Sequence, residues 1–109
     1  MSYDVTFLVD TGGADLFPVA TLNHTSNCAE MFRTAFQTSF GVKELHNMQA
    51  SDARDVVAAA CDHMAKNSGT YAKLNPENLW GDSLSAYVFL RAILSLCEAH
   101  SKAKIIVSC

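Results

Sequence analysis

A run of polar side chains, Asn23 to Asn27, is the first part of the sequence whose residue types could do chemistry. It follows an apolar stretch and precedes apolar residues at helical spacing, so we expect it at the start of a helix. A helix start offers free backbone N–H groups and a partial positive charge, which suit a phosphate or a carboxylate. We therefore predict ligand contacts from His24, Thr25, Ser26 and Asn27. The competing interpretation is an ordinary cap, in which these side chains satisfy the helix's own N–H groups.

The second candidate is the segment 75–82, Asn-Pro-Glu-Asn-Leu-Trp-Gly-Asp, which holds the only tryptophan of the chain. Proline, asparagine and glycine crowd this segment, so we expect a loop. An indole beside a polar loop can stack on a base or another ring. Asn78 and Asp82 could then hydrogen-bond to that ligand, so Asn78, Trp80 and Asp82 join the predicted site. Alternatively, Trp80 packs into the core and Asp82 caps the helix that follows.

The third candidate is Arg91, the only charged residue between Leu84 and Cys97. An unpaired guanidinium is costly to bury, so Arg91 must reach solvent or have an anionic partner. The partner could be Asp82, Glu98, a neighbouring chain or an anionic ligand. Arg91 is therefore both a candidate ligand-binding residue and a candidate for a structural ion pair.

Catalytic and metal-binding patterns are weak by comparison. The sequence has no HExxH, GxSxG or Walker A motif and no CxxC pair. Cys28, Cys61 and Cys97 lie in apolar helical stretches, which predicts buried, reduced thiols. His24 and Cys28 could meet at a helix start, but no third residue that would orient them is specified. We predict no catalytic residue, no metal site and no cofactor.

The spacing of hydrophobic residues predicts the strands and helices that position these side chains. Alternation predicts a hairpin of strands 3–9 and 17–22, with Pro18 placing the second strand at an edge or a strand start. Spacing of three and four residues predicts helices from about 28 to 40, from 51 to 66 and from 83 to 100. Residues 71–74 suit one extra helical turn, and residues 105–107 suit a final strand beside the first.

The order β-β-α-α-α-β predicts an α+β fold: a small, mostly antiparallel sheet with three helices packed on one face. A length of 109 residues, half of them hydrophobic, suits a single domain over residues 1–109. Eight Lys and Arg are scattered against eleven Asp and Glu. Without a basic patch, binding to duplex nucleic acid or to an anionic membrane surface is not expected. The longest apolar stretch, 84–97, is also too short to span a membrane.

The predicted third helix is apolar around almost its whole circumference. Such a helix is buried on all sides, which is difficult in a chain of 109 residues. The simplest solution is a second copy covering one side, so we expect a homo-oligomer. The alternative is a central helix wrapped by the other two helices and the sheet.

Three segments carry a resemblance to a known group of proteins: Met1-Ser2-Tyr3-Asp4, Asn23-x-Thr25-x-Asn27, and Asn75-Pro76-Glu77-Asn78-x-Trp80-Gly81-Asp82. Together they resemble a family of small proteins of unknown function encoded by bacteriophages of actinobacteria, over nearly the whole chain. The resemblance implies a phage origin and a location in the cytoplasm of the infected host. It implies no activity.

The sequence is compatible with three candidate functions. The first is a non-enzymatic oligomer that holds a small anionic molecule, such as a nucleotide-derived immune signal of the host, and so blocks defence. The second is an inhibitor or adaptor that binds a host protein through the apolar third helix. The third is a small hydrolase that uses His24, Cys28 or Asp82. For the first function, we expect a pocket at a subunit interface that brings Thr25, Asn27, Trp80 and Arg91 to one ligand.

Overall fold

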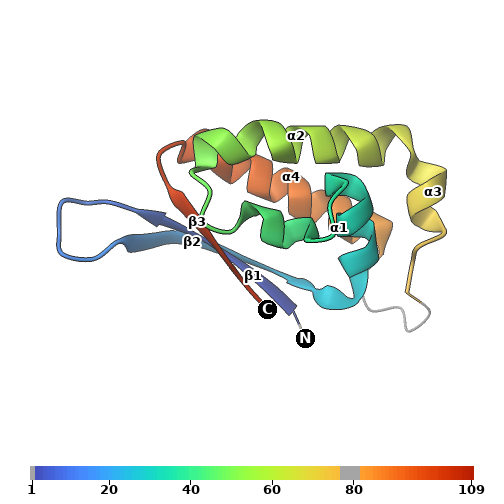
Figure 1. The fold of residues 1–109 in the computed structure, drawn as a ribbon, viewed down its shortest axis with the longest axis horizontal. Coiled ribbons are helices and arrows are strands. Elements are labelled where there is room, and N and C mark those ends of the chain that lie inside the picture. The colour runs from blue at the N-terminus through green and yellow to red at the C-terminus, as the bar shows by residue number, and fades with distance from the viewer. Residues whose placement is uncertain (1, 77–81) are drawn as a thin grey trace.

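Three antiparallel strands and four α-helices make up the described part of the chain, residues 2–76 and 82–109 of a computed structural model (Figure 1). The elements in chain order are β1 (Ser2–Val9), β2 (Phe17–Thr25), a 3-10 turn (Ser26–Cys28), α1 (Ala29–Phe36), a 3-10 segment (Gly41–Leu45), α2 (Ala50–Lys66), α3 (Ser68–Ala72), α4 (Ser83–Ala99) and β3 (Lys104–Ser108). The predicted α+β fold is confirmed. No helix in the described ranges is long and apolar enough to cross a membrane.

The sheet has the order β2-β1-β3, with β1 antiparallel to both neighbours. The expected position of the closing strand beside the first is therefore confirmed. Tyr3, Val5 and Phe7 of β1 are buried, whereas the residues between them are partly exposed. This alternation turns one face of the sheet to the core. The helices cover that face, and the tip of the β1–β2 hairpin projects beyond them (Figure 1).

The core lies between the sheet and the helices, and α4 supplies much of it. The buried residues of α4 are Ala86, Phe89, Leu90, Ile93, Leu94 and Cys97. A stripe at helical spacing stays exposed within one chain: Leu84, Val88, Arg91 and Ser95. One chain therefore does not bury α4 on all sides, and a partner that would cover the stripe remains a prediction.

Several element boundaries differ from the expected ones for local reasons. β2 continues to Thr25, three residues past the predicted end, because Thr25 still pairs with Ser2 of β1. The first helix ends at Phe36 because Gln37 takes a left-handed conformation, with φ of 56°. α2 begins at Ala50 after Gln49, so Ser51 is not its N-cap.

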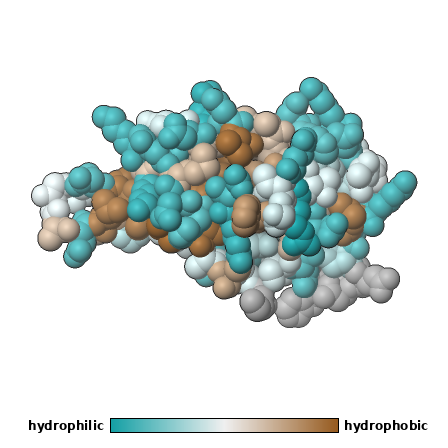
Figure 2. Space-filling view, viewed as in Figure 1, coloured by the Kyte–Doolittle hydropathy of each residue, from teal (hydrophilic) through white to brown (hydrophobic). Residues whose placement is uncertain are grey.

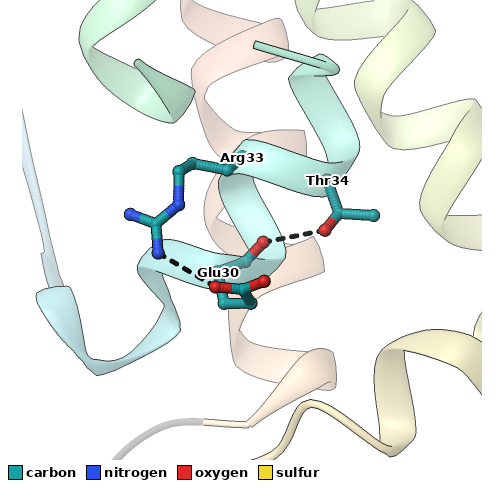
Figure 3. Close-up of polar contacts among 3 residues, drawn as sticks. All are labelled: Glu30, Arg33 and Thr34. Atoms are coloured by element: carbon teal, nitrogen blue, oxygen red, sulfur yellow. Dashed lines mark hydrogen bonds and ion pairs between the residues drawn. The ribbon is translucent and has the colours of Figure 1, made fainter. Parts of the chain in front are cut away.

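The exposed side of α1 is held by local polar contacts (Figure 3). Arg33 Nη2 donates to Glu30 Oε2 at 3.0 Å, and the Thr34 hydroxyl donates to the Glu30 backbone oxygen at 2.9 Å. The ion pair is solvent-exposed and contributes about 0.2–0.5 kcal/mol to the helix. Arg33 therefore already has an anionic partner.

Candidate functional site

His24 links the end of β2 to the start of α4. It lies opposite Tyr3 in the sheet, on the face turned to the helices. Its ring packs against Phe32 and Phe89, with ring centroids 5.5 and 5.1 Å away. Nδ1 lies 3.0 Å from the Thr25 carbonyl oxygen, which can only accept, so this nitrogen carries the proton. Nε2 lies 3.1 Å from the Ser85 hydroxyl oxygen, which also donates to the Asp82 carbonyl oxygen at 3.0 Å.

Asp82 caps α4, which confirms the structural role that the sequence left open. Asp82 Oδ1 accepts from the Ser85 backbone N–H at 2.7 Å, and the Ser85 hydroxyl accepts from the Asp82 N–H at 3.1 Å. The Ser83 N–H donates to Asn75 Oδ1 at 2.9 Å. These N–H groups at the start of α4 are therefore already satisfied by the chain itself.

Removing this cap should weaken the fold measurably. We expect Asp82→Ala to lower the free energy of unfolding by about 1 kcal/mol, because the Ser85 N–H loses its acceptor. Urea unfolding followed by circular dichroism measures the change. Asp82→Asn keeps an oxygen acceptor and should lose clearly less. Equal losses in both variants would show that the cap does not stabilise α4.

The polar run Thr25–Asn27 also has the geometry of a cap. Thr25 Oγ1 accepts from the Asn27 N–H at 3.3 Å. Thr25, and not Asn27, is the N-cap of the turn that follows. That turn has three residues, is a 3-10 turn and runs directly into α1. The ligand contacts of Thr25, Ser26 and Asn27 remain predictions.

Cys28 is the other candidate nucleophile of the sequence, and it comes close to Asp82. Its Sγ lies 3.9 Å from the Asp82 backbone oxygen, and its side chain is fully buried. Burial raises the pKa of the Cys28 thiol, and the Asp82 charge raises it further. The thiol is therefore protonated at neutral pH and is a poor nucleophile.

A cavity of about 330 Å³ opens at the other side of α4, between this helix, the end of α2 and α3. Its lining is largely apolar. The described residues that form it are Met64, Ala65, Ser68, Tyr71, Ser83, Leu84 and Tyr87. None of them was predicted from the sequence, where residues 71–74 stood out only as an extra helical turn.

Tyr71 forms a fixed wall of this cavity. Its hydroxyl lies 2.6 Å from His63 Nδ1, and the two rings meet edge to face at 5.8 Å. Burial raises the pKa of Tyr71, so the phenol stays protonated at neutral pH. The contact ties α3 to the last turn of α2.

Arg91 lies on the same side of α4 as the cavity. It follows Tyr87 by four residues and Leu84 by seven, which places the three side chains on one helix face. Burial raises the pKa of the Cys61 thiol in α2, and the charge of Arg91 opposes this rise. Arg91 is exposed. In residues 2–76 and 82–109, the salt bridges found join Arg33 to Glu30 and Lys66 to Asp62, and none involves Arg91.

The predicted site residues thus fall into separate groups. His24 and Asp82 meet at Ser85, near Thr25, whereas Arg91 lies beside the cavity on another face of α4. Asn78 and Trp80 lie outside the described residues. The described ranges contain no group of three or more His, Cys, Asp or Glu placed to hold a metal ion. Protein-family models, curated proteins and solved structures were compared with the chain, and none matches it.

Proposed function

We propose that the chain binds a small molecule with an aromatic ring and an anionic group, such as a nucleotide-derived signal, and sequesters it. One observation carries the proposal: the cavity between α2, α3 and α4 has two tyrosines in its wall and Arg91 one helical turn away. Its volume, about 330 Å³, lies at the lower end of the range for small-molecule sites. A mononucleotide or a part of a larger nucleotide is the scale of ligand that it suits.

The chemistry of the lining supports such a ligand. Tyr71 and Tyr87 offer aromatic surface against which a flat ring can pack. Arg91 offers a planar guanidinium that can donate two parallel hydrogen bonds to a phosphate. Ser68 and Ser83 add hydroxyl groups in the lining. The ring of the ligand would enter the cavity, and its anionic group would lie at the edge near Arg91.

Binding without turnover is the form of this proposal that the lining favours. The described residues of the cavity include no His, Cys, Asp or Glu that could act as an acid, a base or a thiolate. Combined with the resemblance to actinobacterial phage proteins, this leads to a specific biological role. We propose a phage-encoded homo-oligomer that removes a nucleotide signal of host defence in the cytoplasm of the infected cell.

Isothermal titration calorimetry with AMP and with cyclic dinucleotides tests the binding site. We expect Arg91→Ala to weaken binding about tenfold to a hundredfold, which corresponds to the loss of hydrogen bonds between charged groups. Arg54→Ala is the matched control, because Arg54 is an exposed arginine of α2 that lies about 15 Å along the helix from Met64. It should leave the affinity unchanged.

Adenosine, which lacks the phosphate, should bind the native chain and the Arg91→Ala variant alike. The source of the ligand is tested by native mass spectrometry of protein purified from phage-infected, defence-active cells. A bound molecule of nucleotide mass supports sequestration. Absence of binding to every nucleotide tried, together with an empty protein from infected cells, would overturn the proposal.

A second candidate function is favoured by the exposed stripe of α4. Leu84 is 69% exposed and Val88 is 57% exposed, one turn apart on the same helix. Neighbouring exposed apolar side chains are typical of protein-binding surfaces. An inhibitor or adaptor of a host factor would use this stripe and would show no dependence on nucleotide, so the same titrations separate the two functions.

A further inference from the structure

We infer that the free edge of β2 pairs with β2 of a second copy, so that two chains form one continuous six-stranded antiparallel sheet. The inference deepens the oligomeric part of the proposed function. It places the contact on the sheet edge and not on the apolar third helix, where the sequence alone put it. The order across the dimer would be β3-β1-β2 followed by β2-β1-β3 of the partner.

The edge formed by β3 is already closed by the chain itself. Residues 46–50 run beside it. The Asn47 N–H donates to the Ile105 oxygen at 2.8 Å, and the Ile105 N–H donates to the Met48 oxygen at 2.9 Å. The Val107 N–H donates to His46 Nδ1 at 3.0 Å. The outward N–H groups of Ile105 and Val107 and the outward carbonyl of Ile105 are thus already paired, and residues 46–50 occupy the place that a further strand would take.

The edge formed by β2 is different. Its strand pairs with β1 on one side. On the other side, no backbone hydrogen bond to any residue in the described ranges is found. Backbone N–H and C=O groups in such a row favour pairing with an extended chain. The hairpin also projects beyond the helices, so its edge is accessible to a second molecule (Figure 1).

The side chains of β2 favour a second copy as the occupant. Edge strands are commonly protected by charged residues, by proline or by a bulge. No Asp, Glu, Lys or Arg occurs from residue 16 to residue 25. Pro18 and the register shift at Val19, which has no partner on β1, lie in the half of the strand near the hairpin tip, and this leaves residues 20–25 unprotected. Two uncharged strands meet without like-charge repulsion, and antiparallel pairing of identical strands closes with two-fold symmetry.

Exposed apolar side chains lie at the start of the same strand and just before it. Leu16 is 44% exposed, Phe17 is 59% exposed and Val19 is 38% exposed. Figure 2 shows hydrophobic surface at the base of the projecting hairpin, at the left of the view. A second copy aligned on β2 would remove part of this surface from water, which adds a hydrophobic contribution to the backbone hydrogen bonds.

Sedimentation velocity over a range of concentrations tests whether the dimer forms. The variants Thr21→Lys and Thr6→Lys test whether its interface lies on β2. Thr21 on β2 and Thr6 on β1 face each other, with their hydroxyl oxygens 3.2 Å apart. Either substitution removes the same hydrogen bond and adds the same charge, but only Thr21 lies on the edge strand. We expect Thr21→Lys to raise the dimer dissociation constant at least about tenfold, because the two lysines repel each other across the paired strands. Thr6→Lys should change it less than about threefold, since its charge is one strand further away and screened.

Hydrogen exchange of the native chain gives a readout that does not depend on a variant. Amides in residues 20–25 should exchange more slowly at high protein concentration, whereas those of β3 should not change. A monomer at every concentration would overturn the inference. So would a dimer that survives Thr21→Lys and dissociates with Val88→Asp, which would place the interface on α4. A monomer that still binds nucleotide would refute the dimer and leave the ligand proposal intact.

Discussion

Replacing Phe32 with alanine is expected to lower the free energy of unfolding by about 3–5 kcal/mol, close to the loss typical of a large side chain removed from a core. Phe32 is fully buried in α1 and contacts three aromatic rings. Its centroid lies 5.8 Å from that of Tyr3, 5.5 Å from that of His24 and 5.7 Å from that of Phe89. The side chain therefore joins β1, β2 and α4, and its loss leaves a cavity where these elements meet.

Chemical denaturation at pH 7 measures this effect, and Phe40→Ala is the matched control. Phe40 is 64% exposed, so its removal takes away little packing and should change the unfolding free energy by less than about 0.5 kcal/mol. If the two substitutions cost the same, the aromatic group around Phe32 does not organise the core as the structure indicates.

The free energy of unfolding should also fall as the pH rises from about 9 to about 11. Cys97 is fully buried, and burial, together with the charge of Glu98, raises the pKa of its thiol from 9.0 to about 11. Between these values the unfolded chain releases the proton while the folded chain keeps it. The unfolded state then binds fewer protons, so stability decreases with rising pH. A shift of this size corresponds to about 2–3 kcal/mol, all of it present below pH 9 and lost above pH 11.

Unfolding titrations at several alkaline pH values measure this loss. Cys97→Ala should flatten the profile, because the group that titrates is gone, although it also lowers stability at pH 7 by leaving a small void. Cys109→Ala is the control, since Cys109 is an exposed cysteine. Burial raises the pKa of Cys61 and Tyr71 as well, so a shallower fall should remain in Cys97→Ala. An identical profile in native chain and Cys97→Ala would contradict the assignment.

Much of the fold could be predicted because its signals are local. Alternation along residues 3–9 reflects a strand with one face on a core, and the structure buries Tyr3, Val5 and Phe7 accordingly. Helical spacing predicted α2 and α4, and a cap at Asp82 was one of the two roles that the sequence left open for this residue; the structure shows the cap. The burial of three cysteines followed from the same apolar spacing. Each of these features can be predicted from the types and spacing of residues a few positions apart.

The arrangement of the candidate site depends on contacts between residues far apart in the sequence, which the spacing of hydrophobic residues does not reveal. His24 meets Ser85, 61 residues later, only because β2 ends beneath the start of α4. The cavity is formed by residues of α2, α3 and α4, which the packing of these helices brings together. Likewise, one sheet edge is closed and the other is open because residues 46–50 run beside β3. Periodicity determined which side of each element faces inward, whereas packing between distant segments decided which side chains meet, where space remains and which backbone groups stay free.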